Sequence, residues 1–185
     1  MQTTTPTIYY IIAAIVIIAI VIAVAAGSRR ARSARLQRRF GPEYERTVSQ
    51  AGSREAAERE LAQRESRVKK FHIQELAPGA KQRYSDEWRA VQARFVDEPR
   101  ATVGEADRLV SSVMRDRGYP MDDFDQRVAD LSADHPLVVE NYRAAHAIAG
   151  RSESQEASTE DLRQAMVHYR MLFDDLLGTT ERTTP

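Results

Sequence analysis

The chain has 185 residues, no cysteine, and 27 basic against 27 acidic residues, so its formal net charge is zero. All six basic residues among the first forty are arginines between positions 29 and 39, which leaves 21 basic and 27 acidic residues, a formal charge of −6, for the rest of the chain. The acidity of that part argues against a nucleic-acid-binding module, and the lack of cysteine excludes disulfides, thiolate metal sites and thiol nucleophiles.

The first predicted element is a transmembrane helix over residues 8–26, preceded by a short N-terminal segment, residues 1–7. The nineteen residues from Ile8 to Ala26 carry no charge. As a helix they extend about 28 Å, close to the roughly 30 Å hydrocarbon layer of a bilayer. Eight isoleucines and three valines favour insertion by about 3 to 7 kcal/mol in total. The lipid bilayer is therefore the first expected partner.

Two other interpretations of this apolar run are a buried core helix and a cleaved signal peptide. Core helices rarely lack every polar residue and rarely adjoin an arginine cluster. Ala23-Val24-Ala25 has the small-x-small form of a cleavage site. However, residues 1–7 contain no lysine or arginine, and the run exceeds the usual length of about 7–15 residues. We therefore prefer the uncleaved span.

The residues that flank the span predict its orientation. Tyr9 and Tyr10 lie at one end, where aromatic rings rest among headgroups, and Arg29, Arg30 and Arg32 lie at the other. Flanking arginines stay on the cytoplasmic side, so we expect the N-terminus outside and the soluble part in the cytoplasm. The basic juxtamembrane segment, residues 27–42, also offers anionic lipids a contact through Arg29 to Arg39, although a topology signal is the preferred interpretation.

Small residues recur at four-residue spacing within the span, at Ala19, Ala23 and Gly27. Such a stripe allows two transmembrane helices to approach closely. Self-association through it is left open, because alanine is common in membrane spans.

Residues 43–76 are predicted to form a polar helical spacer. Gly41-Pro42 breaks the chain before it, and Gly52-Ser53 interrupts it weakly. Leu61, Val68 and Phe71 are its main large apolar residues after that interruption. Such a helix buries little apolar surface, so we expect a solvated stalk or one strand of a weak coiled coil.

Residues 80–178 show helical periodicity and are predicted to form a compact domain of about five helices. Their apolar faces are Tyr84, Trp88, Val91 and Phe95; Val103, Ala106, Leu109, Val110, Val113 and Met114; Phe124, Val128 and Leu131; Leu137, Val138, Tyr142, Ala145 and Ile148; and Leu162, Met166, Tyr169, Phe173 and Leu176. No run alternates with period two, so the predicted class is all-α, with a disordered tail at residues 179–185.

Several boundaries of these helices carry recognisable end signals. Gly118 suits a left-handed helix end, and the aspartates at 122, 123 and 125 suit a helix start. Pro136 is expected in a first helical turn, with Asp134 or His135 as its cap. Residues 150–158 are expected to form a mobile polar loop. Ser158 and Asp161 then form an approximate capping box.

The residues that most often carry chemistry give no catalytic or cofactor signature here. The four histidines, His72, His135, His146 and His168, lack metal-ligand spacing to one another. Asp134-His135 could serve as a base with its orienting carboxylate, but helix capping explains both better. The aspartates at 122, 123 and 125 lack the rest of a calcium loop. We therefore predict no enzyme, no cofactor, and no catalytic or metal-binding residue.

The chain from Trp88 onward is similar to small uncharacterised bacterial single-pass membrane-anchored helical proteins. The resemblance is carried by Val91-Gln92, Phe95-Val96-Asp97, Gly118-Tyr119-Pro120, Asp134-His135-Pro136, Tyr142-Arg143, Ala145-His146 and residues 159–163, Thr-Glu-Asp-Leu-Arg. It covers roughly residues 84–177. The resemblance implies a bacterial source and an anchor-plus-helical-domain layout, and it transfers no functional residue. Together with the predicted span and its orientation, we expect the protein in the bacterial inner (plasma) membrane.

The expected function is a membrane-anchored helical interaction module that tethers a protein-binding domain to the inner membrane face, where it binds a protein partner or itself. The alternative is a small-ligand or lipid-sensing domain with a pocket among the aromatic residues, although aromatics at helical spacing are more often core. An enzyme with an unrecognised site is the third hypothesis.

Overall fold

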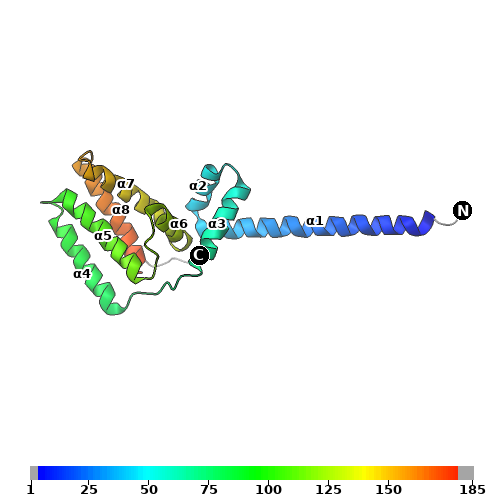
Figure 1. Cartoon of the computed structure of the whole chain (residues 1–185), viewed down its shortest axis with the longest axis horizontal. Coiled ribbons are helices and arrows are strands. Elements are labelled where there is room, and N and C mark those ends of the chain that lie inside the picture. Colours follow the sequence, from blue (N-terminus) through cyan, green and yellow to red (C-terminus); the bar gives the residue numbers. More distant parts are fainter. Residues whose placement is uncertain (1–3, 179–185) are drawn as a thin grey trace. The chain divides into compact units, whose positions relative to one another are not determined.

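A computed structural model describes the backbone of residues 4–178, and the side chains of residue 10 and residues 12–178. Within this range the chain is all-helical, as the sequence predicts, and contains no strand (Figure 1). The described helices are α1 (Thr4–Phe40), α2 (Pro42–Ala51), α3 (Arg54–Val68), α4 (Pro78–Arg94), α5 (Pro99–Asp116), α6 (Phe124–Asp134), α7 (Val139–Glu153) and α8 (Thr159–Leu177). The chain divides into two units, residues 1–39 and 40–185. The predicted disordered tail lies outside the described residues.

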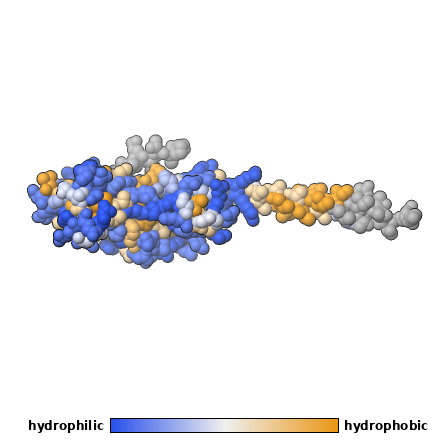
Figure 2. Space-filling view, turned by 90° about the horizontal axis from the view of Figure 1, so that it is seen from above, coloured by the Kyte–Doolittle hydropathy of each residue, from blue (hydrophilic) through white to orange (hydrophobic). Residues whose placement is uncertain are grey.

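The first unit contains α1 up to Arg39, and this helix continues without a break from the apolar run through the arginine segment. Its 37 residues correspond to about 55 Å of helix. In the described range it is the one helix long and apolar enough to cross a membrane, and its apolar stretch is not buried in the chain. Figure 2 shows this hydrophobic stretch giving way to a hydrophilic one along the same helix. Residues 27–40, most of the predicted basic juxtamembrane segment, thus continue the apolar helix.

The second unit begins with a helical hairpin, formed by α2 and α3. Gly41 adopts a positive φ of 47°, and Pro42 then occupies the first turn of α2. Gly52 ends α2 in the left-handed conformation, and the Ser53 hydroxyl caps α3 by accepting a hydrogen bond from the Ala56 amide. The weak interruption predicted at Gly52-Ser53 is therefore a full turn between two helices.

This hairpin corrects the prediction of a solvated stalk over residues 43–76. Tyr44, Ala57, Leu61 and Val68 are buried, and α3 lies against α6 of the helical domain. The large apolar residues are few, but they occur where the two helices meet each other and the domain. Ion pairs also join the hairpin to residues far along the chain, Glu43 to Arg143 and Arg67 to Asp130, and helical periodicity does not reveal these pairs.

Helices α4 to α8 form the predicted domain of five helices. In its interior α8 packs against α5 and α7, while α4 packs on α5 (Figure 1). Nearly all of the predicted apolar faces are buried in one core, and Phe95, Phe124 and Val138 are partly buried at its edge. Trp88 stacks on Phe173 with ring centroids 4.7 Å apart, which joins α4 to α8. The periodicity of the sequence thus identified the core correctly.

The predicted helix ends are also confirmed at three places. Asp123 caps α6 by accepting a hydrogen bond from the Gln126 amide at 2.9 Å. Ser158 and Asp161 form a complete capping box at the start of α8. Gly118 has a φ of 91°, and a Cβ there would lie 2.4 Å from the carbonyl oxygen of His72. The segment after α3 therefore crosses directly over Gly118.

The start of α7 differs from the prediction. The helix begins at Val139, not at Pro136, and Leu137 is 77% exposed where burial was expected. His135 closes α6 instead, because its amide donates to the Leu131 carbonyl at 2.8 Å. Its own carbonyl accepts from the amides of Val138 and Val139. These bonds make residues 135–138 a turn, and the turn leaves Leu137 in solvent.

The end of α7 also differs, because the helix continues to Glu153 and shortens the loop predicted over residues 150–158. The Arg100 guanidinium donates to the carbonyls of Ser152 and Ala157, at 3.2 and 3.0 Å. Ala157 and Ser152 are buried. A side chain from α5 thus holds a connection whose composition predicts mobility.

Candidate functional site

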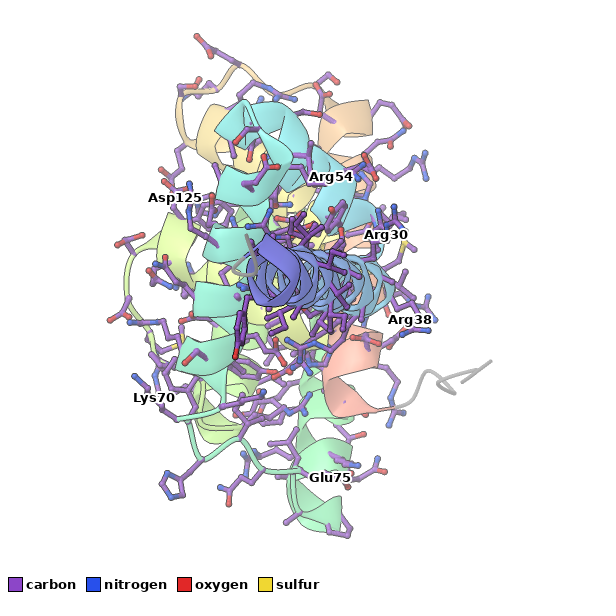
Figure 3. All side chains as sticks on the ribbon, turned by 90° about the vertical axis from the view of Figure 1, so that its right-hand side faces the viewer. Arg30, Arg38, Arg54, Lys70, Glu75 and Asp125 are labelled. Carbon is purple, nitrogen blue, oxygen red and sulfur yellow. The ribbon has the colours of Figure 1, made fainter. Side chains whose placement is uncertain are left out.

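The residues predicted to flank the span all lie on α1. Tyr10 is 76% exposed, and the side chain of Tyr9 lies outside the described side chains. Arg29, Arg30 and Arg32 are exposed and form no ion pair within the described part of the chain. Figure 3 looks along α1 and shows Arg30 and Arg38 projecting outward from the helix. The flanking arginines therefore present free guanidinium groups to whatever surrounds α1.

A buried carboxylate, Glu43, lies where the hairpin meets the domain. Its side chain is 1% exposed, and both oxygens accept hydrogen bonds from the Arg143 guanidinium at 2.7 and 2.8 Å. Arg64 donates to it at 2.9 Å and to the Ser132 hydroxyl at 3.2 Å. Burial favours the neutral acid, but the hydrogen bonds and charges of Arg143 and Arg64 outweigh it and lower the pKa of Glu43. Glu43 is thus an ionised, fully paired group inside the second unit.

A second ion pair joins α3 to α6. Arg67 donates through Nε to both oxygens of Asp130, at 3.0 and 3.2 Å, and through a terminal nitrogen to Asp122 at 2.5 Å. Asp130 is 1% exposed and also accepts from the Gln126 amide group at 2.9 Å. Burial raises the pKa of Asp130, and the hydrogen bond from Arg67 only partly offsets that effect.

We call these five residues, Glu43, Arg64, Arg67, Asp130 and Arg143, the hairpin clamp. They connect α2 and α3 with α6 and α7, and they are the main group that sequence reasoning missed. Glu43 and its partner Arg143 are separated by 100 positions in the sequence. Because charged residues on polar helices usually lie in solvent, no local signal marks Glu43 and Asp130 for burial or the three arginines as their partners.

The histidines are held in separate environments. His135 is 3% exposed, and its Nδ1 contacts the Asp175 carboxylate. Its Nε2 lies 3.4 Å from Arg117, whose guanidinium also donates to the Leu176 carbonyl at 2.9 Å. This cluster closes the end of α8 against the turn after α6. The carboxylate contact is a feature that the capping interpretation of His135 did not predict.

The other histidines have different partners. His146 stacks on Phe124 at 3.7 Å between ring centroids, and its Nδ1 lies 3.7 Å from Asp107. His168 Nδ1 lies 2.8 Å from the Asn141 side-chain oxygen, and His72 is exposed. In the described residues, no group of three or more histidines and carboxylates is placed to hold a metal ion. His135, His146 and His168 thus have different side-chain partners.

The aromatic residues considered for a ligand pocket pack mainly as core. Tyr84, Trp88, Tyr142, Tyr169 and Phe173 are each at most 4% exposed. The Tyr169 hydroxyl donates to Asp107 at 2.8 Å, and the Tyr84 hydroxyl donates to Asp116 at 2.7 Å. Burial raises the pKa of Tyr142 to about 12, so its hydroxyl is protonated at neutral pH.

An apolar groove lies on the surface between α4 and α8. It has a volume of about 210 Å³ and is lined by Gln92, Phe95, Arg163, Met166, Val167 and Arg170. Val167 and Met171, one turn apart on α8, are 46% and 49% exposed. Arg163 and Arg170 lie one turn to either side of Val167 on the same helix. We call this feature the α4–α8 groove.

Comparison with protein-family models finds no matching family, and comparisons with curated proteins and with solved structures find no significant match. The resemblance to small bacterial membrane-anchored proteins accordingly stays a prediction. The functional conclusion therefore depends on the geometry of the chain itself.

Proposed function

We propose that this protein is a membrane-anchored helical interaction module, which tethers a protein-binding domain to the inner face of a bacterial plasma membrane. Two properties support the proposal. α1 is long and apolar enough to span a bilayer, and the arginines that follow its apolar stretch favour a cytoplasmic domain. The helical domain has a well-packed core and an apolar surface groove.

The α4–α8 groove is the observation on which the protein-binding part of this proposal depends. Phe95, Met166 and Val167 supply an apolar floor, and Met171 extends it by one turn. Arg163 and Arg170 flank this floor, and each forms an exposed ion pair along α8, with Glu160 and Asp174 respectively. Exposed pairs of this kind contribute little to stability, so a carboxylate of the partner can join or replace them. The occupant that fits this pattern is an amphipathic helix of a protein partner, with an apolar face bordered by aspartate or glutamate.

Site-specific photo-crosslinking in intact membranes tests this assignment. A photoreactive residue is placed at Val167 in the full-length chain, and Leu137 serves as the control. Leu137 is equally apolar and more exposed, but it is absent from the lining of the groove. We expect a crosslinked product at 167 and none at 137, with the attached peptide mapping to an amphipathic acidic helix. Equal products at both positions, or none at 167, would contradict the proposal.

The orientation has a separate test, because the chain contains no native thiol. Single cysteines introduced by T5C or T180C are labelled in intact cells with a membrane-impermeant maleimide. We expect labelling at position 5 and not at position 180. Labelling at position 180 alone would reverse the proposed orientation.

A further inference from the structure

One face of α1 forms a groove where its apolar stretch ends. Ile22, Ala25, Ala26, Arg29 and Arg30 line it, and its volume is about 460 Å³. These positions follow the spacing i, i+3, i+4, i+7 and i+8, so they share one side of the helix. The two alanines make a shallow shelf, Ile22 bounds it on the apolar side, and the two arginines bound it on the polar side.

The continuity of α1 fixes the depth of each arginine relative to the apolar stretch. At about 1.5 Å per residue, Arg29 and Arg30 lie about 4.5 to 6 Å beyond Ala26, whereas Arg38 lies about 18 Å beyond it. The headgroup layer on each side of a bilayer is roughly 5 to 7 Å thick. Arg29 and Arg30 therefore lie at the depth of the lipid phosphates, and Arg38 lies beyond them.

Arg29 and Arg30 differ from the arginines of the hairpin clamp in their lack of acidic partners among the described residues. Arg143 and Arg67 are each bound to carboxylates within the second unit. Arg29 and Arg30 are exposed and have no ion pair with any described residue. No acidic residue precedes Glu43, so no neighbouring side chain on α1 can neutralise them.

We propose that this groove binds one acidic phospholipid of the cytoplasmic leaflet, with its phosphate on Arg29 and Arg30 and an acyl chain along Ala26, Ala25 and Ile22. Guanidinium groups bind phosphate oxygens in a forked geometry, and a small-residue shelf lets the acyl chain lie close to the helix. The inference rests on the proposed function only in requiring that α1 spans the membrane.

Electron spin resonance of spin-labelled lipids tests this site in the full-length chain. The protein is reconstituted in phosphatidylcholine vesicles that contain trace spin-labelled phosphatidylglycerol or spin-labelled phosphatidylcholine. The measured quantity is the ratio of the protein-restricted fractions of the two probes. We expect a preference for phosphatidylglycerol of up to about fivefold per arginine, which corresponds to about 1 kcal/mol for each basic residue near the lipid surface.

Two double variants remove equal charge at different depths. R29Q/R30Q should bring the ratio close to one, whereas R35Q/R38Q should retain most of the preference. An equal loss in both variants would show that diffuse charge attracts the lipid and would overturn the site. So would the absence of any preference in the unmodified chain.

Two further measurements distinguish a lipid from a soluble phosphate, and a missing lipid site from failed membrane insertion. Added glycerol 3-phosphate should leave the restricted fraction unchanged, and displacement by it would assign the arginines to a soluble phosphate instead of a lipid. Flotation of the vesicles reports insertion independently. A chain that fails to float with the vesicles would contradict the anchor itself, whereas a chain that floats without lipid preference would contradict only the lipid site.

Discussion

Arg143 on α7 binds both carboxylate oxygens of Glu43 on α2, at 2.7 and 2.8 Å, although the two residues are 100 positions apart. Glu43 lies in the first turn of α2, two residues after the glycine that separates α1 from α2. Its buried contacts, with Arg64 as the second donor, make the hairpin part of the helical domain. The chain that follows α1 is therefore attached to the domain within a few residues.

Substitution of Glu43 by alanine should destabilise the second unit strongly. Breaking a buried ion pair typically costs about 3 to 5 kcal/mol. Arg143 and Arg64 are partly buried and keep the exposed partners Glu140 and Glu60, so for E43A we expect a loss of about 2 to 3 kcal/mol. E140A is the matched control, because Glu140 also pairs with Arg143 but its side chain is 51% exposed; there we expect at most about 1 kcal/mol. Urea unfolding followed by circular dichroism measures both. Equal effects would show that Glu43 is not a principal contact.

The contribution of Glu43 should also depend on pH. Its pKa in the folded state is below the ordinary 4.5, so ionisation favours folding. The stabilisation is fully present above about pH 4.5 and is lost as the pH falls through the lowered pKa. The difference in unfolding free energy between the unmodified chain and E43Q should thus stay constant from pH 7 to 5 and shrink below it.

Asp130 should act in the opposite direction, which makes it the control for this titration. Burial raises its pKa, so the folded state favours the protonated acid and ionisation opposes folding as the pH rises. In D130N, the low-pH loss attributed to Glu43 should persist. If that loss vanished in D130N, Glu43 would not be its source.

Gly118 should not tolerate a side chain. Its φ of 91° is strained for any other residue, and a Cβ would lie 2.4 Å from the backbone oxygen of His72. Backbone at both sites would have to move, so we expect G118A to lower the free energy of unfolding by at least about 2 kcal/mol. Gly150, which has open space around it, is the control, and G150A should be neutral or stabilising. Similar losses for both variants would contradict the close approach.

The capping box at the start of α8 should contribute measurably to the free energy of unfolding. The Ser158 hydroxyl accepts from the Asp161 amide at 3.1 Å, and the Asp161 carboxylate accepts from the Ser158 amide at 2.9 Å. S158A should therefore cost about 1 kcal/mol. S154A, which removes an exposed hydroxyl that donates to the Arg151 carbonyl, should change stability by less than about 0.5 kcal/mol. A neutral S158A would argue against the cap.

The elements with strong local signals could be predicted, and those that depend on distant partners could not. The faces containing Trp88, Val110 and Phe173 were found because burial repeats with the helical period. The start of α7 was predicted too early, because the His135 amide and carbonyl bond to Leu131 and to Val138 and Val139, which makes residues 135–138 a turn. The prediction of a solvated stalk was wrong, because Glu43 and Arg67 of the hairpin form ion pairs with Arg143 on α7 and Asp130 on α6.

By itself, the sequence determined the all-α class, the apolar helix at residues 8–26 and the core of the five-helix domain. Each follows from the order of apolar and charged residues along one helix. Only the tertiary structure decided that Glu43 and Asp130 are buried and that residues 43–76 belong to the domain. Ion pairs between Glu43 and Arg143 form across a long sequence separation, so no local pattern encodes them. The fold alone brings such charges together.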